Sequence, residues 1–330
     1  MDLANIQAVL KGEPKYRLAQ IDKLIFQDFI SDWQEATVLP LSLRVALREK
    51  SPLTLISETV SSKDGQTIKA LLTLDDGLKI EAVLMRFKDR NTVCVSSQVG
   101  CPLGCLFCAT GQMGFKRNLN PSEIIGQVLL FARILKREDR KVTNVVFMGM
   151  GEPFLNYNNV LESIKILNDP AKMGLGARRF SVSTCGIIEG IKKLAAEPLE
   201  INLAISLHAP NDEIRTKLMP INKKYPLVNV MDAVGDYLQR TKRKVMFEYV
   251  LLDSVNDSEE CAKELVQLLK QPLYHLNLIQ YNQTGIFRPS TPPKVAAFKK
   301  VLEKKGISFT ERYRFGSEIR AACGQLVSKT

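Results

Sequence analysis

The 330-residue sequence has no apolar run of about 18 residues, the length that a membrane-spanning helix requires. It also lacks a secretory signal at its start, because Met1-Asp2-Leu3-Ala4-Asn5 contains no basic segment followed by an apolar stretch. Only two histidines are present, His208 and His275, and they are far apart in the sequence. We therefore expect a cytoplasmic protein without a membrane association and without a histidine-rich metal site.

Nothing in the sequence points to a disulfide framework. There are seven cysteines, an odd number, and a chain with 45% hydrophobic residues is long enough to bury a large core without covalent staples. Thiols persist in the reducing cytoplasm, where clustered cysteines more often bind metal or perform chemistry. We therefore interpret clustered cysteines in this chain as functional.

Acidic residues are in deficit, with 35 Asp and Glu against 46 Lys and Arg, so the formal net charge is +11. This excess favours a polyanionic partner such as nucleic acid, although a generally basic, solvated surface would give the same count. The basic residues available for RNA include Lys116, Arg117, Arg178, Arg179, Lys223, Lys224, Lys242, Arg243 and Lys244.

The chain divides into three segments by pattern. Residues 1–52 are predicted to be helical, since apolar positions such as Leu18, Ile21 and Leu24 recur at helical spacing. Residues 53–90 form a small β module, with short strands expected at 53–56, 68–71 and 78–81 between Asp-Gly turns. Residues 91–330 form the main α/β domain.

In the main domain, strand and helix patterns alternate. The clearest helix is 121–136, with Asn120 and Glu123 suited to a capping box and Pro121 to the first turn. The expected strands are 92–97, 143–148, 179–184, 201–206, 244–251 and 275–280, with a further candidate at 307–313. Six such units predict an α/β fold, an incomplete (β/α)6 barrel.

Cys101, Cys105 and Cys108 are spaced C-x3-C-x2-C in the loop after the first strand of this domain. A structural zinc site usually has four ligands from two separated pairs, so an incomplete zinc site fits less well than a four-iron cluster with one iron left open. The spacing resembles that of the radical-SAM superfamily. That resemblance implies one [4Fe-4S] cluster and S-adenosylmethionine, which together yield a 5′-deoxyadenosyl radical.

Polar residues follow several of the expected strands, at the edge where barrel active sites are built. Gly151 and Glu152, in Met148-Gly-Met-Gly-Glu-Pro153, look like the superfamily segment that binds the amino group of S-adenosylmethionine. The other candidates for cofactor binding are Ser183, Ser206, Leu207, His208 and Asn282. A polar strand end is common by itself, and it is the recurrence after successive strands that indicates a site.

Two cysteines outside the triplet, Cys94 and Cys323, lie in the segments Cys94-Val-Ser-Ser-Gln-Val-Gly-Cys101 and Ala-Ala-Cys323-Gly-Gln-Leu. These segments resemble the RlmN/Cfr family of RNA adenine methyltransferases. Further matches are Phe-Cys108-Ala-Thr-Gly111, Gly-Phe115-Lys-Arg-Asn118-Leu, Leu203-Ala-Ile-Ser-Leu-His-Ala-Pro210 and Lys217-Leu-Met-Pro-Ile-Asn222. The resemblance covers nearly the whole chain, including the N-terminal helical segment, for which it implies an accessory RNA-binding role.

The resemblance implies a mechanism with two thiols. Cys323 takes a methyl group from one S-adenosylmethionine, and a radical from a second molecule activates that methyl for addition to adenine. Glu81 is then the expected base at the ring carbon, and Cys94 attacks the sulfur of Cys323, forming a disulfide and freeing the product. Cys185 and Cys261 match no role in the family, and we expect both to be packing residues.

The resemblance also implies the partners: 23S ribosomal RNA, with transfer RNA as a second candidate, and an electron donor such as flavodoxin or ferredoxin. We expect a monomer. Glu152 and Pro153 resemble the branch that methylates carbon 2, which we favour, while 13–17 and 315–316 resemble the carbon-8, antibiotic-resistance branch. A non-catalytic RNA-binding protein with a structural cluster is the alternative from another class.

One segment departs from the family pattern. Phe315-Gly-Ser-Glu-Ile-Arg320 replaces an acidic stretch that usually precedes the C-terminal cysteine. We therefore expect Arg320 to place a positive charge beside Cys323, where it would favour the thiolate or contact RNA phosphate.

Overall fold

A computed structural model describes residues 1–270, 273–312 and 315–327. Its centre is a ten-stranded sheet in the order β1-β2-β3-β4-β7-β8-β9-β10-β11-β12. Within this sheet, each neighbouring pair of strands from β4 to β12 is parallel. Their bounds are β4 (Arg90–Cys94), β7 (Asn144–Phe147), β8 (Phe180–Thr184), β9 (Asn202–Ser206), β10 (Val245–Leu251), β11 (Tyr274–Gln280) and β12 (Phe309–Glu311). In the described residues β1 and β12 are the sheet's two open edges, as expected for an incomplete barrel.

The predicted β module is continuous with this sheet. Its strands are β1 (Ile56–Ser61), β2 (Thr67–Thr73) and β3 (Lys79–Phe87), joined in antiparallel pairs, and β3 pairs antiparallel with β4. The strand expected at 53–56 begins only at its last residue. Leu53 instead lies buried, and its carbonyl accepts a hydrogen bond from the Arg133 side chain at 3.3 Å.

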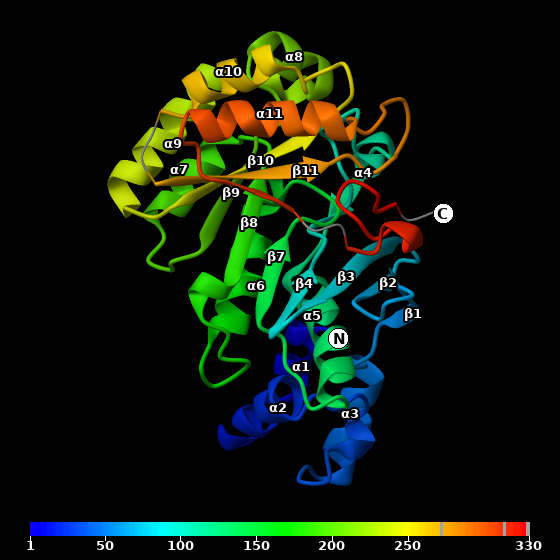
Figure 1. Cartoon of the computed structure of the whole chain (residues 1–330). Coiled ribbons are helices and arrows are strands. Elements are labelled where there is room, and N and C mark those ends of the chain that lie inside the picture. The colour runs from blue at the N-terminus through cyan, green and yellow to red at the C-terminus, as the bar shows by residue number, and fades with distance from the viewer. Residues whose placement is uncertain (271–272, 313–314, 328–330) are drawn as a thin grey trace.

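Helices alternate with the parallel strands and cover the outer face of the sheet (Figure 1). They are α5 (Pro121–Lys136), α6 (Tyr157–Asn168), α7 (Ile188–Ala196), α8 (Asp212–Leu218), α9 (Leu227–Thr241), α10 (Glu259–Leu268) and α11 (Pro292–Lys304). The predicted start of α5 is confirmed, because Asn120 and Glu123 form the reciprocal capping box. In the described part of the chain, no helix is both long and apolar enough to cross a bilayer.

The first 52 residues form three helices, α1 (Leu3–Val9), α2 (Tyr16–Phe26) and α3 (Leu41–Lys50), shown in blue in Figure 1. Trp33 is buried between them and donates from Nε1 to the carbonyl of Ser51 at 2.7 Å. Arg133 of α5 donates to the carbonyl of Ile30 at 3.1 Å. The helical segment is therefore attached to the main domain by α5, and its apolar residues belong to the same core.

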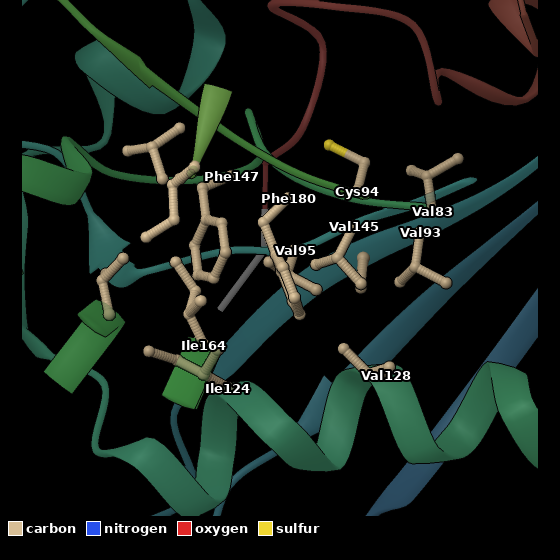
Figure 2. Packing of buried hydrophobic residues seen from close by; sticks show 14 of the residues in the cluster. Val83, Val93, Cys94, Val95, Ile124, Val128, Val145, Phe147, Ile164 and Phe180 are labelled. Atoms are coloured by element: carbon tan, nitrogen blue, oxygen red, sulfur yellow. The ribbon is translucent and has the colours of Figure 1, made fainter. Parts of the chain in front are cut away.

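The two faces of β4 have different neighbours. Val93 points toward α5, where Val128 packs, whereas the adjacent Cys94 points to the opposite side of the sheet (Figure 2). This follows from the two-residue period of a strand. The alternation directs the thiol of Cys94 to the inner, concave side of the sheet, where the candidate site lies.

Candidate active site

The cysteine triplet lies in a compact loop between β5 (Gln98–Gly100) and the short helix α4 (Ala109–Gln112). The amide of Cys108 donates to the carbonyl of Cys105 at 3.2 Å, which draws the loop together. Gly111 packs against the same segment, since a Cβ at this position would lie 2.9 Å from the nitrogen of Cys105. The sequence thus needs glycine at 111 to keep the loop folded on itself.

The donor set of this loop fits an iron–sulfur cluster. All three ligand candidates are thiols, and Cys101, Cys105 and Cys108 pack in one apolar group under the loop. Burial raises the pKa of the Cys101 thiol to about 12, so its thiolate form requires bound positive charge such as iron. In the described ranges, no three His, Cys, Asp or Glu side chains are grouped around a single-ion site. Thiolates that each bind a different iron of a cluster need not be so grouped.

A cavity of about 150 Å³ opens beside the loop, and we call it the cluster-side cavity. It is lined on one side by Phe107 and Cys108 of the loop and elsewhere by residues at the carboxyl ends of the parallel strands. The polar or glycine residues among these are Gly149, Gly151, Glu152, Ser183, Thr184, Ser206, His208, Glu248, Gln280 and Asn282. This is the edge at which parallel α/β folds place their ligands.

Glu152 is the most buried acid of this cavity, at 2% exposure. One carboxylate oxygen accepts from the amide of Phe154 at 3.0 Å and the other from the amide of Cys185 at 2.7 Å. Burial raises the pKa of Glu152, and these amide donors oppose the shift. A ligand ammonium in the cavity would further favour the ionised carboxylate.

His208 has a structural task as well as a place in the cavity wall. Its Nδ1 accepts from the amide of Val250 at 3.1 Å, which leaves Nε2 as the donor of a neutral ring. The ring meets Phe107 edge-on, with centroids 4.7 Å apart. Burial, aided by the charge of Arg215, lowers the pKa of His208 to about 3, so the residue is neutral at physiological pH.

A second cavity of about 300 Å³, the lumen cavity, lies deeper along the concave side of the sheet. Its walls include Val83, Met85 and Cys94, together with Ala321 and Ala322 of the C-terminal segment. The two cavities share a boundary of six residues, namely Met148, Ile279, Gln280, Asn282, Arg312 and Cys323. Cys323 therefore faces the cluster side and the lumen at once.

Hydrogen bonds fix the C-terminal segment at this boundary. Ala109 of α4 donates its amide to the carbonyl of Gly324 at 2.8 Å, and Thr110 Oγ1 donates to the carbonyl of Leu326 at 2.7 Å. Asn282 Nδ2 donates to the carbonyl of Cys323 at 3.2 Å. The segment, red in Figure 1, thus lies against α4, the helix that ends the cluster loop.

The two outlying thiols share this environment. Cys94 and Cys323 line the same cavity, and each remains a free thiol. Burial raises the pKa of Cys94 to about 12, which keeps it protonated and prevents premature attack, because the thiolate is the nucleophile. Cys323 is exposed, yet desolvation of its thiol by the surrounding atoms raises its pKa, and the Arg312 guanidinium opposes that shift.

The comparisons with known proteins agree with this geometry. A family model for the radical SAM superfamily matches residues 95–266. A probable dual-specificity RNA methyltransferase RlmN from Dictyoglomus thermophilum is 44% identical over 98% of this chain and 94% of its own length. This chain belongs to the RlmN family. The ribosomal RNA large subunit methyltransferase N of Nitrosopumilus maritimus is 44% identical over 96% of this chain and 93% of its own.

The RlmN family likeness extends to the solved structures. The crystal structure of a radical SAM methyltransferase from Sphaerobacter thermophilus superposes with a TM-score of 0.95. It is 45% identical to this chain and covers 99% of it and 97% of its own chain. The α/β fold expected from the sequence is confirmed. Membership of the superfamily implies that an RlmN-type chain works with an iron–sulfur cluster and S-adenosylmethionine.

Most of the predicted site residues of this RlmN-type chain meet in the two cavities. Four of them, Leu207, Glu81, Cys101 and Cys105, are not among the described residues that line either cavity. The side chain of Leu207 is fully buried. Glu81 is also buried and lies under the C-terminal segment. Its carboxylate pairs with Lys69 at 2.9 Å and accepts from the amide of Val327 at 2.8 Å. The role of Glu81 as a base stays a prediction.

Two charged residues of the site, Arg312 and Glu248, were not identified from the sequence. Arg312 lines both cavities, and its Nη1 lies 3.6 Å from a carboxylate oxygen of Glu248. Arg320, which we expected beside Cys323, is exposed and lines neither cavity. Its backbone adopts a left-handed conformation, and its carbonyl accepts from Lys69. Glu248 could have been noticed as the single charge inside the apolar strand 245–251.

Cys185 packs against the apolar group under the cluster loop, as expected for a packing residue, and it also has a place in the site. It lines the cluster-side cavity together with Cys108, and its amide binds Glu152. Cys261 is buried on α10, also as expected. Among the basic residues assigned to RNA, Arg117 forms ion pairs with Asp76 and Glu123 and so has a structural role.

Proposed function

We propose that this protein methylates carbon 2 of an adenine in 23S ribosomal RNA, and of an adenine in transfer RNA, through a methylated Cys323. The observation that carries the proposal is the position of Cys323 on the boundary between the cluster-side cavity and the lumen cavity, which also contains Cys94. A carrier thiol must reach the cofactor first and the base afterwards. Cys323 lines both the cluster-side cavity and the lumen cavity, so it could meet the cofactor in one and the base in the other without a large movement.

The chemistry of the substrate explains why two thiols are needed. Carbon 2 of adenine is an electrophilic amidine carbon, so a polar methyl transfer from a sulfonium finds no nucleophile there. When bound, the cluster and S-adenosylmethionine supply a carbon-centred radical by one-electron cleavage. We propose that two molecules of S-adenosylmethionine are used per turnover, one as methyl source and one as radical source.

The residues of the chain then have distinct tasks. The guanidinium of Arg312 stabilises the thiolate of Cys323 as it takes the methyl group. Glu81 accepts the ring proton after the methyl carbon has joined the base. Cys94 attacks the sulfur of Cys323, so that a disulfide forms and the S–C bond breaks; the released carbon takes up a proton to become the methyl group, and the unpaired electron left on the base would return to the electron-transfer chain that reduced the cluster. Gly151, Glu152, Ser183, Ser206, Leu207, His208 and Asn282 bind S-adenosylmethionine.

The charge of the protein and the chemistry of its thiols support the proposed partners and compartment. The net charge of +11 suits an RNA substrate, and free thiols suit the reducing cytoplasm. An acidic electron carrier such as flavodoxin or ferredoxin would reduce the cluster. We propose that the N-terminal helical module, 1–52, contributes to RNA binding and that the protein acts as a monomer.

A second candidate function is methylation at carbon 8. It is favoured by the sequences 13–17 and 315–316, which resemble the antibiotic-resistance branch. Carbon 2 is better supported, because Glu152 and Pro153 match the other branch and the Dictyoglomus thermophilum relative bears the RlmN name.

Nucleoside mass spectrometry tests the proposal. The reconstituted protein would be incubated anaerobically with unmodified 23S ribosomal RNA, S-adenosylmethionine and a low-potential reductant. We expect 2-methyladenosine, and none from the Cys323→Ala variant with its cluster intact. The carbon-8 isomer alone would refute the assignment of position, and transfer RNA in a parallel reaction tests the second substrate.

A further inference from the structure

Arg215 of α8 is a fully buried cation whose role none of the predicted chemistry explains. In the described part of the chain, its five hydrogen bonds all go to uncharged oxygens. These are the carbonyls of Cys185 (2.7 Å), Ser206 (3.2 Å), Leu207 (3.2 Å) and Tyr225 (3.4 Å), and Oδ1 of Asn222 (2.7 Å). A buried guanidinium without a bound carboxylate is costly, so its position calls for a functional reason.

The carbonyls that Arg215 holds belong to the wall of the cluster-side cavity. Cys185 follows β8 directly, and Ser206 is the last residue of β9. Both residues line that cavity. Arg215 therefore ties two neighbouring strand ends together from behind the cavity wall, and its planar fork suits this task because it donates in several fixed directions.

The helix that carries Arg215 also touches the cluster loop. The amide of Leu106, between Cys105 and Cys108, donates to the carbonyl of Leu218 at the end of α8 at 3.0 Å. Leu218 packs in the same apolar group as Cys105. The buried charge thus lies next to the loop that would hold the cluster.

The electrostatic balance of Arg215 is incomplete within the protein alone. Burial lowers its pKa, and the thiols of Cys185 and Cys105 and the carboxylate of Asp212 oppose that shift, yet an arginine remains charged throughout. Asp212 is linked to it through the side-chain amide of Asn222, whose Nδ2 donates to Oδ1 of Asp212 at 2.8 Å. A cluster held by three thiolates is anionic, and reduction adds one further negative charge near this cation.

We propose that Arg215 is a positioning residue that shapes the wall for S-adenosylmethionine and whose buried charge favours the reduced state of the cluster. This inference rests on the proposed cluster ligands Cys101, Cys105 and Cys108. Two effects are separable. The planar guanidinium holds the two strand ends in place, and its positive charge favours the reduced state of the cluster.

Variants at 215 separate charge from geometry. Arg215→Gln removes the charge, and we expect a more negative midpoint potential in an electron paramagnetic resonance titration of the reconstituted protein. The expected change is about tenfold in the ratio of reduced to oxidised cluster at fixed potential, which is about 59 mV for one electron. Arg215→Lys keeps the charge but loses the fork. Its potential should stay near that of the wild type, while its affinity for S-adenosylmethionine falls about tenfold.

Asp212→Asn is a test in which the midpoint potential of the cluster should shift in the opposite direction. Asparagine oxygen can still accept from Asn222 and from the amide of Leu227, which binds Asp212 at 2.8 Å, so the fold should persist. Losing this negative charge should shift the potential to a more positive value. Arg133→Gln is the matched control, because Arg133 is a partly buried arginine that donates to carbonyls on the N-terminal helical side. It should lower stability without changing the potential.

The outcomes are distinct. If the wild type itself binds no cluster, the proposed function fails. If Arg215→Gln and Asp212→Asn bind a full cluster with an unchanged potential, the charge role of Arg215 is overturned. Unchanged affinity of Arg215→Lys for S-adenosylmethionine would overturn the shaping role. Should Arg215→Gln not fold, Asp212→Asn still decides the question of charge.

Discussion

The side chain of His208 shows how the site uses a titratable residue as a fixed, neutral part. Its Nδ1 accepts a backbone amide, and its backbone has φ of 57°, a conformation that is uncommon outside glycine and asparagine. A protonated imidazole at this position would be repelled by the positive charge of Arg215. The neutral ring is therefore part of the wall rather than an acid or base.

This state of His208 predicts a pH dependence of stability. In the unfolded chain its pKa is about 6.5, and in the fold it is about 3. Between these values the unfolded state binds the extra proton, so stability falls as the pH is lowered, by up to about 1.4 kcal/mol per unit. His208→Asn keeps an acceptor and tolerates the backbone. Urea unfolding of the apo-protein would give the free energy of unfolding at pH 7 and at pH 4.5. The decrease between these two pH values should be smaller by about 2 kcal/mol in the variant than in the wild type. Equal decreases would contradict a buried, neutral His208.

At the same scale, the sequence indicated which residue types would carry the chemistry but not every partner. The three cluster cysteines were identified from their spacing, and Cys94 and Cys323 from the sequence motifs around them. Arg312 was missed because its proximity to Cys323 is created by β12 lying beside β11, a long-range pairing. Arg320 was chosen instead because it is near in sequence, and the turn at Gly316–Arg320 directs it outward.

At the scale of elements, the cluster loop depends on one close backbone approach. In Gly111→Ala, the new methyl group would lie 2.9 Å and 3.0 Å from backbone atoms of Cys105, so the loop must shift. We expect the variant to bind less iron and sulfide after reconstitution, and to lose about 1–3 kcal/mol of stability. Chemical analysis of iron per protein measures the effect.

Gly176→Ala is the control, because Gly176 has no atom within 4 Å of an added Cβ and no positive φ. It should bind iron as the wild type does. A Gly111→Ala protein with a full complement of iron would show that the loop does not need this contact.

Local signals predicted elements well and their partners less well. The helix 121–136 was predicted to the residue, because its capping box and proline are local features. The β module was expected to lead into the main domain, but nothing in its own sequence indicated that β3 would pair with β4 and so continue the main sheet. Strand pairing depends on which edges meet in space, and this information is not contained in either strand alone.

At the scale of the whole molecule, the fold brings together groups that are more than 200 residues apart. Cys94 lies on the first parallel strand and Cys323 near the C-terminus, and the curvature of the sheet places both on one cavity. The C-terminal segment completes the cavity wall through its bonds to α4. The central claim is that Cys323 carries the methyl group to the base and that Cys94 then attacks the sulfur of Cys323 to release the product.

A trapping experiment with Cys94→Ala tests that claim most directly. Cys323 would still take the methyl group and join the RNA, but no thiol would release the product. Denaturing electrophoresis and intact mass spectrometry after one turnover should therefore show a covalent protein–RNA adduct attached at Cys323, which a Cys94→Ala/Cys323→Ala double variant cannot form. Normal release of methylated RNA by Cys94→Ala, with no adduct, would contradict the account.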